Sequence, residues 1–385
     1  MKIAIFDYKT TRTNPIGSCH HRMIESLCRD HEFTVFATEF DNPDPTRIRF
    51  VRVIVPKRPL AVLFIAYHIV APICFFWNWL KRRERFDLIQ MVESNCFVGR
   101  DVDYVQFVHR RFLRQWWPLV KGKGLRSHLR FLDHWVHARF EPWVYAGARV
   151  IVVPSKGTAR EVSEEYPSVA SKVRVLHNPV DLAKYSRPVD FDRVGTRGKL
   201  RINPEDVLMV FAALGHFERK GLPLIMEAMK QLRRPELKLI VVGGERDLVE
   251  TYRERTHGME LDGQIQFLGM QSDIRPHLYA ADAFVFPSSY EAFSLVTLQA
   301  AAAGLPSIVT PLNGVEEFTI DGKNGLIIER SDAGVRAGIE RFLSLTPDQR
   351  VLMGRSARQD VSVFAADIFD QKWRDLYAEM GTRNR

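Results

Sequence analysis

Residues 287–306 place an acidic side chain and the start of a helix directly after an apolar run. They read PSSYEAFSLVTLQAAAAGLP and follow the apolar run 280–286. We expect Glu291 in the turn, where its carboxylate can accept hydrogen bonds from hydroxyl groups. The backbone N–H groups of Phe293, Ser294 and Leu295 would open the next helix and face an anion. The stretch therefore predicts a site for phosphate and hydroxyl groups.

A second loop supplies cations. Residues 215–221 read GHFERKG, follow the apolar run 207–213 and precede the helical run 222–232. A cation aimed at a developing phosphate oxyanion can stabilise the departing charge without a metal. Lys220, helped by Arg219, is therefore our candidate for binding a diphosphate.

These segments resemble the retaining GT-B glycosyltransferases of the GT4 family. The residues around Glu291 match the E-x7-E signature, with Gln299 in place of the second Glu. The loop 215–221 is similar to the family's phosphate loop, but it is one residue shorter and lacks its first Arg, whose part His216 or Arg219 can take. The likeness extends over about residues 150–332. It includes two turns, containing Gly243 and Gly269, that resemble the turns lining the family's nucleotide pocket. The phosphate loop begins at Gly215.

The resemblance implies a retaining transfer of sugar from a nucleotide diphosphate donor to a glycan or lipid-linked acceptor, without a metal or cofactor. It places Gln299 at the nucleotide ribose and His109 near the transferred sugar. Gly17 would let the first helix approach the donor closely. A turn glycine without a ligand and a structural histidine are the alternatives for Gly17 and His109. For the whole protein the alternatives are a catalytically decayed scaffold or binding protein and a nucleotide-sugar epimerase.

Strand-like apolar runs alternate with helix-length segments in both halves of the chain. Such alternation predicts an α/β protein, and the resemblance implies two doubly wound Rossmann-like domains facing across a cleft. We expect an acceptor-binding domain over 1–185, a linker over 186–204 and a donor-binding domain over 205–363, with the C-terminal helix 364–385 packing back on the first domain. The strands of the first half are predicted at 2–6, 33–36, 88–91, 104–108, 150–153 and 173–176.

The positive charge is concentrated in the first domain. Residues 1–185 contain 29 Lys and Arg against 18 Asp and Glu, whereas the remainder contains 26 against 28. This asymmetry favours a polyanion or an anionic membrane surface as a partner of the first half. No nucleic-acid motif is present, so we do not expect nucleic acid. The four cysteines have unrelated spacings, which is typical of reduced thiols in the cytoplasm.

Residues 60–80 are apolar for about the length of a bilayer span, and the basic run KRRER follows at 81–85. His68, Pro72 and Asn78 argue against a clean transmembrane helix. A helix packed inside the first domain, a helix seated on a membrane surface and a true span remain as alternatives. We therefore predict a cytoplasmic protein with peripheral contact to the cytoplasmic face of the inner membrane.

Asp101 and Asp103 formally match a D-x-D metal motif. Three-residue motifs arise often by chance, and we expect both side chains to be solvated. No other cluster of His, Cys or Asp has metal-ligand spacing, so no metal site is predicted.

Overall fold

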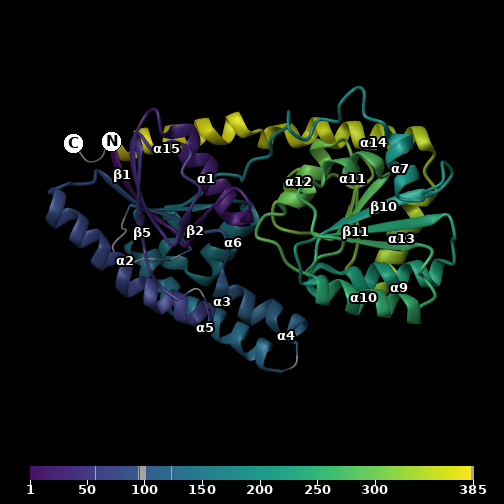
Figure 1. Cartoon of the computed structure of the whole chain (residues 1–385), viewed down its shortest axis with the longest axis horizontal. Helices are drawn as coiled ribbons and strands as arrows, with labels where there is room; N and C mark the ends of the chain where they lie inside the picture. The colour runs from purple at the N-terminus through teal and green to yellow at the C-terminus, as the bar shows by residue number, and fades with distance from the viewer. Residues whose placement is uncertain (57, 94, 96–100, 123, 383–385) are drawn as a thin grey trace. The chain divides into compact units, whose positions relative to one another are not determined.

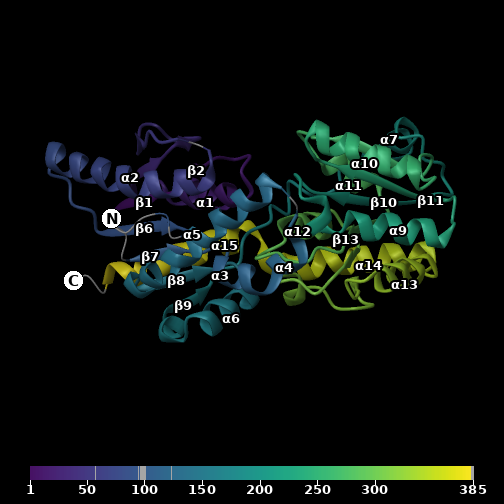
Figure 2. The ribbon, with the colours of Figure 1, turned by 90° about the horizontal axis from the view of Figure 1, so that it is seen from below.

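The computed structural model describes all residues except 57, 94, 96–100, 123 and 383–385 (Figure 1). The chain divides into two compact units, Met1–Pro179 with Asp367–Arg385 and Val180–Ala366. Each unit is built on a parallel sheet with helices on both faces (Figures 1 and 2). The prediction of an α/β protein with two doubly wound sheets is confirmed.

The first unit contains a seven-stranded parallel sheet in the order β5-β3-β1-β6-β7-β8-β9. Its strands are β1 (Lys2–Phe6), β3 (Glu32–Ala37), β5 (Ile48–Arg52), β6 (Leu88–Val92), β7 (Val102–Tyr104), β8 (Val150–Val153) and β9 (Val173–Val175), and a separate pair comprises β2 (Lys9–Thr10) and β4 (Glu39–Phe40). The helical elements are α1 (Pro15–Leu27), α2 (Leu60–Arg82), α3 (His109–Arg111), the π-helical turn η1 (Phe112–Trp116), α4 (Trp117–Val120), α5 (Leu125–Gly147), α6 (Lys156–Glu165), η2 (Pro167–Lys172) and α15 (Ala366–Thr382).

Alternate residues of the strands bury opposite faces of this sheet. Ile3 and Ile5 of β1 belong to a core with side chains of α1 and α15. Ala4 and Phe6 belong to a second core with side chains of α2, α5 and α6. Successive side chains of a strand point to opposite faces, so an apolar run without alternation is what a sheet covered on both sides requires.

The second unit contains a six-stranded parallel sheet in the order β12-β11-β10-β13-β14-β15. Its strands are β10 (Val207–Ala212), β11 (Leu237–Val242), β12 (Ile265–Gly269), β13 (Ala283–Phe286), β14 (Ser307–Val309) and β15 (Gly325–Ile327). The helical elements are α7 (Arg193–Lys199), α8 (Phe217–Lys220), α9 (Leu222–Leu232), α10 (Arg246–Gly258), α11 (Arg275–Ala280), α12 (Leu295–Ala302), η3 (Val315–Glu317), α13 (Asp332–Leu343), α14 (Pro347–Asp360) and η4 (Val361–Phe364).

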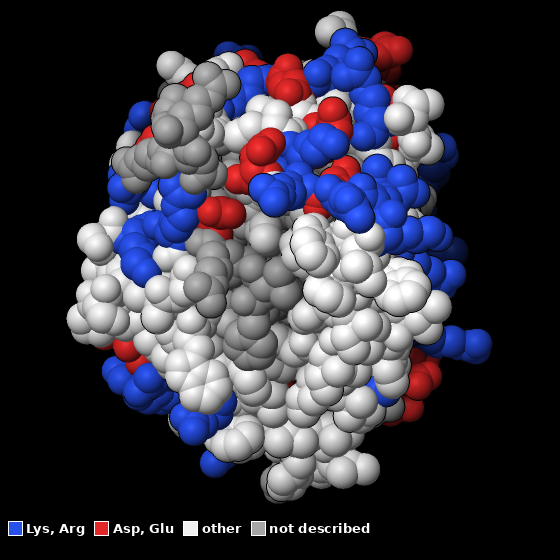
Figure 3. Space-filling view, turned by 90° about the vertical axis from the view of Figure 1, so that its left-hand side faces the viewer, with Lys and Arg blue, Asp and Glu red and all other residues white. Residues whose placement is uncertain are grey.

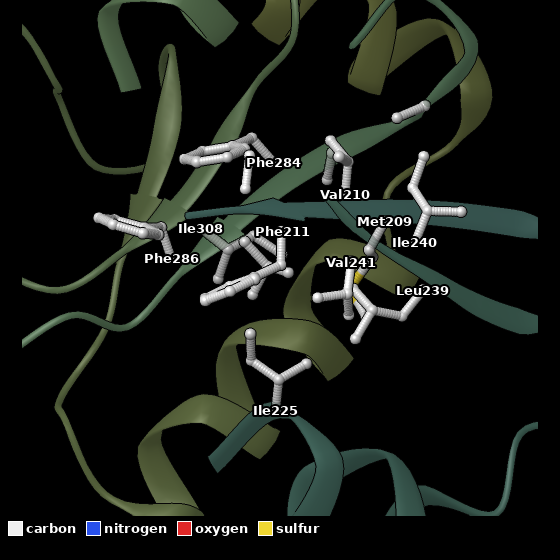
Figure 4. Packing of buried hydrophobic residues seen from close by; sticks show 14 of the residues in the cluster. Met209, Val210, Phe211, Ile225, Leu239, Ile240, Val241, Phe284, Phe286 and Ile308 are labelled. Atoms are coloured by element: carbon white, nitrogen blue, oxygen red, sulfur yellow. The ribbon is translucent and has the colours of Figure 1, made fainter. Parts of the chain in front are cut away.

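The core of this unit forms around the two central strands. Ile225 of α9 points toward Phe211 of β10 and Val241 of β11 (Figure 4). The rings of Phe284 and Phe286 on β13 stack with centroids 5.5 Å apart. Figure 1 shows α9 and α10 on one face of the sheet and α11 and α12 on the other. This core holds the carboxyl ends of β10 and β13 in fixed positions.

Residues 186–204, expected to link the domains, lie inside the second unit and contain α7. The guanidinium of Arg197 is buried and donates to the carbonyls of Ala280, Asn203 and Asp206 at 3.2, 3.0 and 2.6 Å. It also donates to the carboxylate of Asp282 at 3.1 Å. These bonds fix the stretch to the unit despite its polar composition.

Two further expectations for the first unit differ from the structure. A strand is predicted over 104–108. In the structure β7 ends at Tyr104, and Val105–Val108 lie outside it. The expected solvation of the two aspartates is wrong, because Asp103 is fully buried in β7. Asp101 accepts from the Ile89 backbone at 2.8 Å and from Arg149 at 3.1 Å. The Asp101 carboxylate is therefore held by hydrogen bonds within the unit, and the Asp103 carboxylate is shielded from water.

We predict that Arg197→Ala lowers the free energy of unfolding by about 3–5 kcal/mol, because buried acceptors lose their donor and the Asp282 carboxylate loses its buried partner. The matched control is Arg193→Ala. Arg193 donates to the other oxygen of Asp282 at 2.6 Å, but its side chain is 37% exposed, so the expected loss is below about 1 kcal/mol. Urea unfolding followed by circular dichroism measures both, and equal losses would contradict the anchoring role of Arg197.

Candidate functional site

The candidate site lies at the carboxyl edge of the second sheet, where two loops leave neighbouring strands. β10 and β13 pair in parallel, so the segments that follow them emerge from the same edge. The first segment leads into α8 and ends at Gly221, and the second covers residues 287–294. Ligands of open α/β sheets bind at this edge.

Three charged side chains from these two segments meet. Lys220 Nζ donates to Glu291 Oε1, and Ser288 Oγ donates to the same oxygen at 2.8 Å. Arg219 Nη1 lies 3.9 Å from Glu291 Oε1 and donates to the Tyr290 carbonyl at 2.6 Å. The ammonium of Lys220 also lies 5.3 Å from the ring centroid of Phe286, within reach of a cation–π interaction. The structure thus brings Lys220, Arg219 and Glu291 together.

Gly221 lets the two loops approach closely. Its φ is +84°, and a Cβ atom on it would lie 2.2 Å from the Pro287 carbonyl oxygen. The Ser289 N–H donates to the Arg219 carbonyl at 2.9 Å. Arg330, which follows β15, donates to the carbonyls of Pro287 and Glu218 at 3.2 Å each. Backbone contacts therefore hold the loops together independently of the charged pair.

Burial and charge act in opposite directions at the ion pair. Burial lowers the pKa of Lys220 to about 8, although Glu291 opposes the shift, and Arg219 lowers it further. Burial would raise the pKa of Glu291, but Lys220 and Arg219 hold it below its usual value. The carboxylate is thus ionised at neutral pH, and the ammonium can lose its proton slightly above neutrality.

The start of α12 differs in detail from the expectation. The Leu295 N–H donates to the Phe293 carbonyl at 3.0 Å, and Ser294 Oγ lies 2.7 Å from Thr297 Oγ1. The ring of Phe293 is buried and packs 5.7 Å from that of Phe364. Phe293 and Ser294 shape the turn, while Gln299 lies half-buried one turn into α12.

Glycines shape the neighbouring loops at the same edge. Gly243 has a φ of +100°, and a Cβ atom there would lie 2.0 Å from the Ala213 carbonyl oxygen. Its N–H donates to the Gly269 carbonyl at 2.7 Å, which joins the ends of β11 and β12. Gly215 and Gly269 have no heavy atom within 4 Å of an added Cβ. Their predicted role at the nucleotide stays a prediction.

The other two predicted residues belong to the first unit. The Gly17 N–H donates to Asn14 Oδ1 at 2.8 Å. A Cβ atom on Gly17 would lie 2.2 Å from the Lys9 carbonyl oxygen. Close packing of α1 on β2 therefore requires a glycine here, and its role at the donor stays a prediction.

His109 begins α3 in a cluster of buried aromatic and ionisable groups. Its N–H donates to Glu141 Oε1 at 2.6 Å, and its Nδ1 lies 2.9 Å from Nδ1 of His134. Its ring stacks on that of His137 at 4.3 Å. Burial and then His137 and His134 lower the pKa of His109 well below its usual value, so the ring is neutral.

Carboxylates near this cluster have raised pKa values. Burial raises the pKa of Glu141 to about 7 and that of Asp133 to about 6. Burial, together with the charges of Asp7, Asp133 and other carboxylates, raises the pKa of Glu93 to about 8. His109 Nε2 and Glu93 Oε1 are buried without a hydrogen-bond partner among the described residues. The first unit therefore has its own polar, protonatable region.

Sequence reasoning missed several of these groups. Arg330 lies outside every recognised motif, and its contact with both loops follows only from the position of β15 in the sheet. His134 and His137 are three residues apart on α5, and this spacing on one helical face was an available signal. Within the described residues, no group of three or more His, Cys, Asp or Glu is placed to hold a metal ion.

Two family models match the chain. The model described as "Glycosyl transferases group 1" matches residues 205–345, and "Glycosyltransferase Family 4" matches residues 19–184. Among sequence relatives, the lipopolysaccharide core biosynthesis glycosyltransferase LpsE of Rhizobium meliloti (strain 1021) is 29% identical over 214 residues. The alignment covers 55% of this chain and 62% of LpsE, so the chain spans less than two thirds of that relative.

Solved structures show the same fold over nearly the whole chain. WaaG, a glycosyltransferase involved in lipopolysaccharide biosynthesis, superposes with a TM-score of 0.76 at 18% identity, covering 98% of this chain and 99% of WaaG. Anabaena HepE in complex with UDP-glucose gives a TM-score of 0.72 at 17% identity, covering 98% of this chain and all of HepE. The family models and the fold lead to the same assignment.

We predict that Gly221→Ala destabilises the protein by at least about 2 kcal/mol, because it combines an unfavourable positive φ with a clash against Pro287. The control is Gly263→Ala, where an added Cβ meets no heavy atom within 4 Å. Calorimetric melting compares the two. Equal melting temperatures would show that the loops can separate without cost.

Proposed function

Because the chain belongs to the GT4-type glycosyltransferases of the GT-B fold, we propose that it transfers a sugar from a nucleotide diphosphate donor with retention of anomeric configuration. The convergence of Lys220, Arg219 and Glu291 at one sheet edge carries this proposal. The cations suit the donor diphosphate and the carboxylate suits the sugar hydroxyls.

The contacts of Glu291 would let its carboxylate hold the loop with one oxygen and bind a ligand with the other. Within the described residues, the hydrogen bonds and ion pairs of Glu291 all fall on Oε1. Oε2 is therefore available to accept from a sugar hydroxyl while Lys220 and Ser288 hold the side chain in place. Gln299 can replace a carboxylate at the ribose, since an amide accepts one hydrogen bond and donates another.

The proposed reaction breaks the bond between the sugar C1 and the diphosphate oxygen and forms a bond from C1 to an acceptor hydroxyl on the same face. The departing phosphate takes the acceptor's proton, so the step needs no dedicated protein base. Lys220 and Arg219 would stabilise the negative charge that develops on the leaving diphosphate. A metal ion is not required for this arrangement.

We further propose a glycan or lipid-linked acceptor in cell-surface polysaccharide or lipopolysaccharide synthesis. The similarity to LpsE and the likeness to WaaG support this acceptor class. The complex of HepE with UDP-glucose supports a nucleotide-sugar donor. The basic first half suits a cytoplasmic enzyme with peripheral membrane contact. His109 would lie near the transferred sugar.

Two rival functions remain testable. A decayed scaffold would bind a nucleotide sugar without releasing sugar, and an epimerase would convert the donor with no acceptor present. Thermal stabilisation by a panel of nucleotide sugars identifies the donor, because a ligand bound only by the native state raises stability with concentration. Product analysis with that donor, with and without acceptor, then separates the three functions.

We predict that Glu291→Gln and Lys220→Met each lower kcat/KM for sugar transfer by about 100-fold or more, because each removes a charge aimed at the transition state. The control is Lys323→Met. Lys323 is a 52%-exposed lysine of the same unit that pairs with Asp360 at 2.9 Å, and its variant should retain normal turnover. Both site variants turning over at the wild-type rate would remove Lys220 and Glu291 from the mechanism.

We also predict that diphosphate binding weakens as pH rises through about 8, because Lys220 loses its proton there when no diphosphate is bound. Calorimetric titration with the tightest binder among UDP, ADP and GDP should show about a tenfold higher Kd at pH 9 than at pH 7. Lys220→Arg should flatten the profile, since guanidinium keeps its charge. The same slope in both proteins would assign the titration to another group.

A further inference from the structure

Helix α2 exposes a continuous apolar stripe. Successive turns carry side chains that are 45–65% exposed, namely Val62, Ile65, Ile69, Ile73, Phe76, Trp77 and Leu80. Apart from the adjacent pair Phe76 and Trp77, they recur every three or four residues, which places them on one face of the helix. The sequence 60–80 contains no Asp, Glu, Lys or Arg. Monomeric soluble proteins rarely expose apolar side chains over such a length, which marks the stripe as a binding surface.

The opposite face of α2 is fixed to the first unit. Phe64 and Tyr67 are fully buried. The Phe64 ring lies 5.3 Å from that of Phe140 on α5. The Tyr67 hydroxyl donates to the carbonyls of Phe36 and Asp7 at 2.5 and 3.2 Å. α2 is long and apolar enough to cross a membrane, and 28% of its most apolar window is buried. Its anchored face indicates that the helix stays on the unit and presents only its stripe.

Basic side chains adjoin the carboxyl end of this stripe. Lys81, Arg82, Arg83 and Arg85 are exposed. The intervening Glu84 is neutralised by Arg49, which donates to it, and lies 3.6 Å from Lys2. Figure 3 shows this side of the molecule, where a broad area without charged side chains lies below a band of Lys and Arg. Aromatic side chains such as Trp77 favour the boundary between headgroups and acyl chains.

We propose that the α2 stripe seats the first unit in the plane of an anionic lipid bilayer, with the stripe in the acyl boundary and the basic run on the headgroups. Apolar area and charge attraction act together in such interfacial helices. The charge complementarity favours anionic lipid over a second copy of this chain, since the net positive first halves of two copies would repel each other. The inference deepens the proposed function, because a lipid-linked acceptor is held in the same layer.

Flotation of the full chain with lipid vesicles tests membrane binding in the absence of donor and acceptor. Its outcome is therefore independent of sugar transfer. The wild type should bind vesicles that contain phosphatidylglycerol and bind pure phosphatidylcholine vesicles more weakly. Ile69→Gln with Ile73→Gln should lower the partition coefficient about tenfold or more. The matched control is Val351→Gln with Leu352→Gln on α14, where exposure is 54% and 64%, and it should bind normally.

A charge variant separates the two contributions. Lys81→Gln with Arg82→Gln and Arg83→Gln should remove the preference for anionic vesicles and leave binding to neutral ones unchanged. Circular dichroism and melting temperature confirm that each variant is folded. Unchanged flotation of the α2 variant overturns the proposal. A wild-type dimer that does not float with vesicles and becomes monomeric in the α2 variant also overturns it, in favour of a contact between copies.

Discussion

The placement of Lys220 and Glu291 in the segments that follow two adjacent parallel strands is the constraint on which the candidate site depends. β10 and β13 are neighbours in the sheet, so a lysine after one and a glutamate after the other meet at its carboxyl edge. The pair is mostly buried. Lys220 and Arg219 keep the Glu291 carboxylate ionised against the effect of burial, whereas burial lowers the pKa of the Lys220 ammonium. Because Gly221 and Arg330 tie the loops through backbone atoms, a ligand can rearrange the charges without separating the loops.

The sequence was most informative where short-range chemistry and sheet topology coincide. The apolar strands Val207–Ala212 and Ala283–Phe286 and the polar loops after them could be recognised from composition alone. The doubly wound pattern then required both loops to leave the same edge of a sheet. The contact between Lys220 and Glu291 follows from these two facts, and its chemical role stays a prediction.

The features that could not be predicted depend on long-range packing. Strand β5 reads IRFVR and is the edge strand beside β3, so its sequence carries charged residues and lacks the continuous apolar run by which the other strands could be recognised. The polar composition of 186–204 is typical of a linker. The structure shows instead that Arg197 donates to backbone carbonyls as far away in the sequence as Ala280, which fixes the stretch to the second unit. His109 directly follows the strand predicted at 104–108, whereas in the structure it begins a helix whose first N–H groups donate to Glu141, 32 residues away.

The first unit takes its final helix from the far end of the chain. Trp373 and Tyr377 of α15 are fully buried in its core, and the Tyr377 hydroxyl donates to Gln90 at 2.7 Å. Residues 180–366, which form the whole second unit, leave the ribosome before α15 does. The unit that is synthesised first is thus completed last, and part of one face of its sheet stays uncovered until residues 366–382 have been made.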